Sequence, residues 1–201
     1  MAALDRSAAE FVNRLAQHQP GRLFALVAAT WLLAVPLLAL LWLAVGAIRR
    51  REPQTITLLA LAVVGALAAL GLHQLVDHLY FRPRPYWALQ AVHAIGTRRG
   101  DSSFFSLQAA IAAALACGLL LAARRWGLAA VAAALLIGLG QVATGANYPL
   151  DVAVGWSRVV AAGCVGGVHG AGGGEQGEQP GRTEGERAEH IGQPVRAQIQ
   201  P

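Results

Sequence analysis

Long apolar segments separated by short polar turns make up most of this chain. A helix of about 20 apolar residues spans the roughly 30 Å hydrocarbon core of a bilayer, so each such segment is a candidate membrane span. Four segments are strong, and a fifth is weaker because an arginine interrupts it. They run over residues 23–48, 55–79, 104–123, 128–142 and 151–168. The pattern therefore predicts an all-α membrane protein with about five transmembrane helices in a bundle.

The first 20 residues show a different pattern, in which apolar positions recur at helical spacing instead of running continuously. Leu4 and Phe11 fall on one face, whereas Asp5 and Asn13 belong to the polar residues that fall largely on the other. A helix with one apolar and one polar face lies in the membrane interface and does not cross the bilayer. We therefore expect residues 1–20 to form an interfacial amphipathic helix.

Residues 21–168 contain the predicted transmembrane domain, and the composition changes after them. Gly, Glu, Gln, Arg and Pro dominate residues 169–201, where scarcely any apolar side chain remains. Such a segment cannot bury a core, so we predict a disordered Gly/Glu/Arg-rich tail. The abrupt loss of pattern after Trp156 supports a second hypothesis, that the tail is an out-of-frame translation of a GC-rich gene.

The composition fits a membrane protein and limits the chemistry that the chain can perform. Charged residues make up only 13% of the 201 positions, whereas soluble domains carry roughly 25%. All 16 basic residues are arginine, so no lysine can act as a nucleophile. Cys117 and Cys164 lie apart in apolar stretches without metal-ligand spacing, and no basic run is interleaved with aromatic residues. We expect no metal, no other cofactor and no nucleic-acid partner.

The polar loop after the second span presents two arginines, Arg82 and Arg84, each followed by a proline. Proline fixes its own φ and pushes the preceding residue into an extended conformation. Both guanidinium groups are therefore held near the end of a membrane helix, and phosphate is the anion that best fits their planar fork. The competing interpretation is a proline-broken helix end whose arginines snorkel to the membrane surface.

Three polar clusters stand at the ends of predicted spans, namely Arg82–Pro85, Ser103–Gln108 and Gln141–Asp151. Their order and spacing resemble the type 2 phosphatidic acid phosphatase superfamily, over about residues 5–157. Within that superfamily they look most like the bacterial undecaprenyl diphosphate phosphatase branch. The resemblance implies a membrane phosphohydrolase that acts on a polyprenyl or other lipid phosphate through a phospho-histidine.

Some positions keep the residues that the family motifs require. Arg84 and Ser106 match phosphate-contacting residues of the family, and Arg82 is a further candidate for phosphate contact. Asp151 matches the carboxylate that orients the nucleophile. Each also has a purely structural interpretation, because Arg84 could pair with Asp77, and Ser106 and Asp151 could cap helices.

Other positions depart from the motifs. Gln108 stands where the family has the histidine that protonates the leaving group, and Asn147 stands at the nucleophilic histidine. Gln141 replaces the second phosphate-binding arginine, and Asp77 stands at the lysine of the first motif.

The chemistry of these replacements predicts a lipid phosphatase relative that is catalytically impaired, that is, a pseudoenzyme. The amide nitrogen of Asn147 cannot attack phosphorus because its lone pair is delocalised, and Gln108 cannot give up a proton near neutral pH. Losing a covalent nucleophile typically costs on the order of 10⁶ in turnover. Two alternatives remain open: a non-catalytic protein that binds a lipid phosphate, and the product of a decayed gene.

Counting the spans gives a topology for this multi-pass cell-membrane protein. The loop over 81–103 and the turn over 143–150 lie on one side, and the arginines of 49–51 and 124–125 lie on the other. Cytoplasmic loops are enriched in arginine and lysine, which places the phosphate site on the extracytoplasmic side. Arg6, Arg14 and Arg22 depart from this rule. The sequence does not indicate the oligomeric state.

Overall fold

The structure is a computed structural model that describes residues 2–98 and 100–157. The predicted disordered tail and the end of the fifth span lie outside these residues. The described part is helical and contains no strand, which confirms the all-α class. Its helices are α1 (Ala2–Ala16), α2 (Gly21–Thr30), α3 (Ala34–Arg50), α4 (Pro53–Leu79), α5 (Pro85–Ala88), α6 (Leu107–Ala122) and α7 (Arg124–Ala143), and a further helix occupies residues 149–157.

Three of the apolar stretches are long enough to cross a membrane by length and composition. They are Gly21–Arg50, Pro53–Leu79 and Arg124–Ala143. Helix α6 is shorter, since its 16 residues extend for about 24 Å at 1.5 Å per residue. The fifth predicted span begins with the helix at residue 149 and passes out of the described part of the chain.

A turn over residues 31–33 divides the first predicted span into α2 and α3. Pro36 has no N–H, so it cannot donate to the carbonyl of Leu32 four residues earlier. The N–H of Val35 donates to that carbonyl instead, at 3.1 Å. The proline therefore accounts for the break within an otherwise continuous apolar stretch.

The turn that the sequence suggested at 124–127 is wrong, because these residues form the first turn of α7. The reversal from α6 is made at Ala123 alone, whose backbone is extended with φ −155° and ψ 100°. So short a connection brings the two helices into direct backbone contact. Gly127 permits this, because a Cβ there would collide with the backbone of Leu120.

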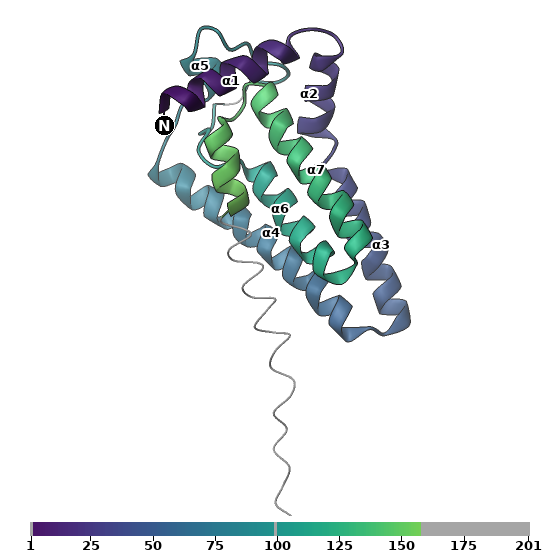
Figure 1. Cartoon of the computed structure of the whole chain (residues 1–201). Coiled ribbons are helices and arrows are strands. Elements are labelled where there is room, and N and C mark those ends of the chain that lie inside the picture. Colours follow the sequence, from purple (N-terminus) through teal and green to yellow (C-terminus); the bar gives the residue numbers. More distant parts are fainter. Residues whose placement is uncertain (1, 99, 158–201) are drawn as a thin grey trace, which may run out of the picture.

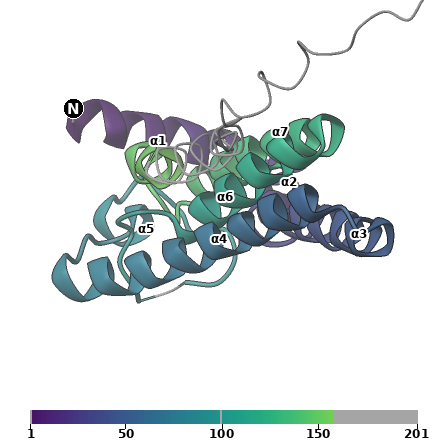
Figure 2. The ribbon, with the colours of Figure 1, turned by 90° about the horizontal axis from the view of Figure 1, so that it is seen from below.

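Helix α6 forms the centre of the bundle, between α4 and α7 (Figures 1 and 2). Its buried face consists largely of alanine, with Ala112 and Leu119 fully buried. Small residues let membrane helices approach closely. At the contact between α6 and α4, a Cβ on Gly118 would overlap the Cβ of Ala62.

Helix α1 lies across one end of the bundle, away from the turn that joins α3 to α4 (Figure 1). Asp5 and Asn13 are buried, whereas Leu4 and Phe11 are 78% and 61% exposed. The apolar stripe thus faces outward. Asp5 and Asn13 turn inward because the loops beneath α1 offer them hydrogen-bonding partners.

Candidate functional site

The three polar clusters meet at the end of the bundle that α1 covers. The Arg84 guanidinium donates to the carbonyl of Ala146 at 2.8 Å, which joins the Arg-Pro loop to the turn after α7. The Asn147 amide donates to the carbonyl of Ser103 at 2.7 Å, which joins that turn to the segment before α6. Residues more than 60 positions apart in the sequence therefore form one polar assembly.

Arg82 is held between two carboxylates. It donates to Asp151 at 2.5 Å and to Asp5 at 2.8 Å, and its Cζ lies 3.9 Å from the centroid of the Tyr148 ring. Burial lowers the pKa of the Arg82 guanidinium, but the hydrogen bonds and charges of Asp5 and Asp151 outweigh burial and raise it. The positive charge of Arg82 is already neutralised by Asp5 and Asp151, so its guanidinium has few free donors for a phosphate.

Tyr148 completes the surroundings of Arg82. The residue is only 3% exposed, and burial raises the pKa of its phenol. The positive charge of Arg82 lowers that pKa but offsets burial only in part. Tyr148 therefore remains a neutral aromatic surface against the guanidinium.

Arg84 is buried and pairs with Asp101 rather than with Asp77. Its guanidinium lies 2.8 Å from Oδ1 of Asp101, and its Nε donates to the same oxygen at 3.1 Å. Asp77 instead accepts from the backbone N–H of Ser102 at 3.0 Å. The side chain of Asp101 is 36% exposed. Arg84 is thus paired with a carboxylate that has access to solvent.

A cavity of about 190 Å³ adjoins Arg84. Gln108 from α6 and Gln141 from α7 also line it, and their side-chain amides are hydrogen-bonded to each other. Gln141 donates as well to the carbonyl of Ala29 in α2 at 3.2 Å. The cavity therefore brings together one guanidinium and two amides from three separate parts of the chain.

Ser106, Asn147 and Asp151 lie together in the interior but do not line this cavity. Asp151 is fully buried, and its Oδ2 accepts from the Ser103 hydroxyl at 2.7 Å. The backbone N–H of Ser106 donates to the carbonyl of Asp151 at 3.2 Å, and the Ser106 side chain makes no capping hydrogen bond to α6. The structure thus divides the predicted site residues into a cavity group and a buried group.

The histidines lie elsewhere in the described structure. His73 is buried in α4, with its ring centroid 5.5 Å from that of Phe105. The backbone of His93 is bound by Asn13, which accepts from its N–H at 2.9 Å and donates to its carbonyl at 2.9 Å. Neither histidine lines the cavity beside Arg84. The described cavity wall therefore offers no imidazole in place of Gln108.

Sequence reasoning missed three residues that fix the site. Asp5 and Asp101 are the partners of the two arginines, and Ser103 binds both Asp151 and Asn147. Asp5 was placed on the polar face of a separate interfacial helix, and Asp101 was one polar residue in a polar loop. No spacing pattern in the sequence signals these contacts, because they join distant parts of the chain.

Comparison with known proteins gives two matches and one negative result. The model of the PAP2 superfamily matches residues 55–169, which is more than half of the chain. Undecaprenyl-diphosphatase BcrC of Bacillus subtilis (strain 168) is 33% identical over 91 residues, covering 45% of this chain and 47% of that protein. The chain thus spans about half the length of this relative. No solved structure is significantly similar.

Proposed function

This chain belongs to the PAP2 superfamily, and from that premise we propose that it binds the phosphate of a membrane lipid with little or no hydrolysis. The similarity to an undecaprenyl-diphosphatase confirms the predicted resemblance and supports a polyprenyl diphosphate as the ligand class. The observation that carries the proposal is the cavity that Arg84, Gln108 and Gln141 share. All three side chains carry N–H donors, which suit the oxygens of a phosphate group.

The loss of hydrolysis follows from the groups that now occupy the reactive positions. Gln108 is hydrogen-bonded to Gln141, and Asn147 is buried with its amide on the Ser103 carbonyl. Neither amide can attack phosphorus or transfer a proton near neutral pH. No hydrogen bond joins Asp151 to Asn147 within the described part of the chain, so the carboxylate orients an arginine and a serine instead.

Charge balance supports weak binding rather than tight binding. Two guanidinium groups, Arg82 and Arg84, meet three carboxylates, Asp5, Asp101 and Asp151. A phosphate oxygen can reach Arg84 only by competing with Asp101. Because the Asp101 side chain is partly exposed, it can be rehydrated when it leaves Arg84, which limits the penalty.

We also propose that the site faces the extracytoplasmic side of the membrane. The opposite end of the bundle carries Arg49–Arg51 and Arg124 with Arg125. Five arginines beside the ends of spans favour a cytoplasmic location for that end. A lipid phosphate at the outer surface would then meet the cavity beside Arg84.

The test uses the full chain, purified in detergent. With undecaprenyl diphosphate, phosphate release should not exceed that of a protein-free blank, and clear turnover would overturn the proposed loss of hydrolysis.

With farnesyl diphosphate, a short polyprenyl diphosphate, calorimetry should detect weak binding that Arg84→Ala removes. Arg22→Ala, which removes an exposed arginine of α2, should leave that binding unchanged. Absence of binding in the unsubstituted protein would favour the product of a decayed gene.

A further inference from the structure

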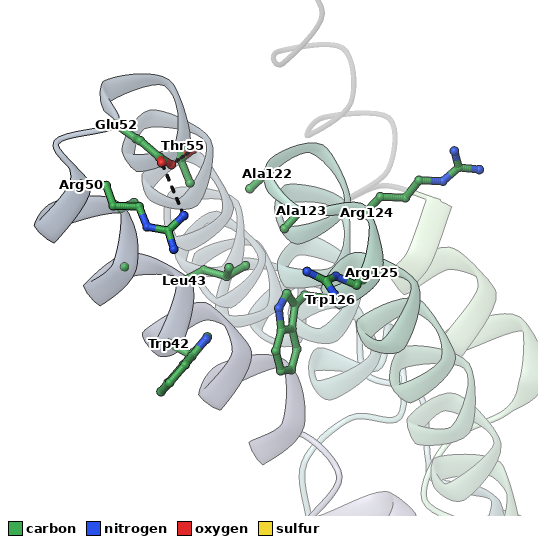
Figure 3. Close-up of a pocket in the computed structure, with 12 residues that line it drawn as sticks. Trp42, Leu43, Arg50, Glu52, Thr55, Ala122, Ala123, Arg124, Arg125 and Trp126 are labelled. Atoms are coloured by element: carbon green, nitrogen blue, oxygen red, sulfur yellow. Dashed lines mark hydrogen bonds and ion pairs between the residues drawn. The ribbon is translucent and has the colours of Figure 1, made fainter.

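A second cavity, of about 530 Å³, lies at the opposite end of the bundle from the candidate site. It is bounded by the last turns of α3, the turn into α4, and the junction between α6 and α7. We name it the distal cavity, and the side chains that define its character are Trp42, Arg50, Glu52, Arg124, Arg125 and Trp126 (Figure 3).

The distal cavity has more positive than negative charge. Arg50, Arg124 and Arg125 line it, and Glu52 is the carboxylate among its lining residues. Glu52 lies 4.0 Å from Arg50, and both side chains are well exposed. The side chains of Arg124 and Arg125 have neither a hydrogen bond nor an ion pair with any residue in the described part of the chain. The cavity therefore offers guanidinium groups that can bind an anion.

The orientation of the side chains brings two of these three arginines to the cavity. In Figure 3, Arg50 points from α3 toward the cavity, Arg125 lies beside Trp126, and Arg124 points away. Two guanidinium groups from different helices thus flank the same space. A guanidinium presents donors in a planar fork that fits phosphate oxygens.

The remaining wall is apolar. Leu43 of α3 points toward Trp126 of α7 (Figure 3), and Trp42, Ala122 and Ala123 also line the cavity. Tryptophan favours the membrane interface, where its ring packs against apolar groups while its N–H remains hydrated. A ligand that fills the whole cavity must therefore combine an anionic group with an apolar part.

We propose that the distal cavity binds the phosphate headgroup of an anionic membrane phospholipid. Arg50 and Arg125 contact the phosphate, and Trp42 and Trp126 contact the glycerol and the first methylene groups. The cavity lies where α3 ends and α7 begins, which is the depth at which lipid phosphates meet the ends of membrane spans. This proposal does not depend on the function proposed for the candidate site.

The first experiment compares three probes on the full chain in a zwitterionic detergent, by calorimetry. Dioctanoyl phosphatidylglycerol should bind, and dioctanoyl phosphatidylcholine should bind at least tenfold more weakly because its headgroup has no net charge. Inorganic phosphate should also bind at least tenfold more weakly because it lacks the apolar part. If inorganic phosphate binds as tightly as phosphatidylglycerol, the cavity is a simple anion site and the proposed lipid is wrong.

The second experiment compares matched variants with equal loss of charge. Arg50→Gln with Arg125→Gln should weaken phosphatidylglycerol binding at least tenfold. Arg49→Gln with Arg22→Gln removes two exposed arginines that do not line the cavity, and should change it less than twofold. Equal losses of phosphatidylglycerol affinity in both double variants would show that the overall positive charge, and not the distal cavity, attracts the lipid.

A third variant tests the proposal without removing an arginine, in case the first pair does not fold. Glu52→Gln deletes the carboxylate beside Arg50 and retains an oxygen that can accept from Thr55, as Glu52 does at 3.2 Å. It should strengthen phosphatidylglycerol binding by two- to fivefold, and Glu10→Gln in α1 should leave it unchanged. Weaker or unaltered binding in Glu52→Gln would contradict the proposed phosphate position.

Discussion

The guanidinium of Arg82 donates to the carboxylate of Asp5 at 2.8 Å and so joins α1 to the loop after α4, 77 positions away in the sequence. The same guanidinium donates to Asp151. An arginine that the sequence suggested as a phosphate contact therefore connects two buried carboxylates on different helices. Its primary effect is to hold α1 over the candidate site.

Asp5→Asn should destabilise the protein. The substitution leaves an oxygen for the N–H of Leu150, which donates to Asp5 at 2.9 Å, but it removes one of the two charges that neutralise Arg82. We expect a loss of about 1–3 kcal/mol in the free energy of unfolding, measured as a lower thermal midpoint in detergent. Glu10→Gln, on the same helix, should leave the midpoint unchanged, and an equal decrease in both variants would contradict this role for Asp5.

Asp101→Asn should strengthen phosphate binding at the candidate site. The carboxylate competes with any ligand for the Arg84 guanidinium, at 2.8 Å. Removing its charge should raise the affinity for farnesyl diphosphate on the order of three- to tenfold, as measured by calorimetry. Glu10→Gln changes the net charge equally on α1 without lining either cavity, and similar gains from both variants would argue against local competition.

Restoring the family residues tests whether the scaffold can still support hydrolysis. Gln108→His, Gln141→Arg and Asn147→His, introduced together, should raise phosphate release from undecaprenyl diphosphate on the order of 10³-fold or more above the unsubstituted protein. Adding Asp151→Asn to this triple variant should abolish the gain, because the new histidine at 147 would lose its orienting carboxylate. Activity that survives Asp151→Asn would exclude that role.

Tyr148 should ionise only at a pH above its ordinary range. Burial raises the pKa of its phenol in the folded protein, whereas in the unfolded chain it titrates near pH 10. The folded state therefore holds the phenol proton more tightly than the unfolded chain does. The contribution of Tyr148 to stability is complete below about pH 10, and it is lost as the pH rises through the folded pKa. An ultraviolet titration of tyrosinate should show one late-titrating tyrosine that is missing in Tyr148→Phe. Identical titration curves would contradict this prediction.

Gly118→Ala should destabilise the contact between α6 and α4, because the new methyl group would overlap Ala62. Overpacking of this kind typically costs about 1–3 kcal/mol. Gly71→Ala in α4 adds the same methyl group where no atom lies within 4 Å, and should raise the thermal midpoint slightly because alanine favours helix over glycine. Midpoints that move together would show that close packing at Gly118 is unimportant.

The helical architecture could be predicted because it depends on local composition. The second span was expected from Thr55 to Leu79, and α4 runs from Pro53 to Leu79. A continuous apolar stretch in a membrane must satisfy its own backbone hydrogen bonds, and a helix does this with neighbouring residues alone. The helical start of α7 was missed because it depends on packing at Gly127.

For the candidate site, the sequence by itself determined that positions 108 and 147 carry amides and no imidazole, wherever these residues lie. Only the tertiary structure decided which partners the arginines have. Asp5 and Asp101 reach Arg82 and Arg84 because helices and loops distant in the sequence pack together. A charged side chain takes its partner from three-dimensional proximity, and the spacing of residues along one chain does not encode that proximity.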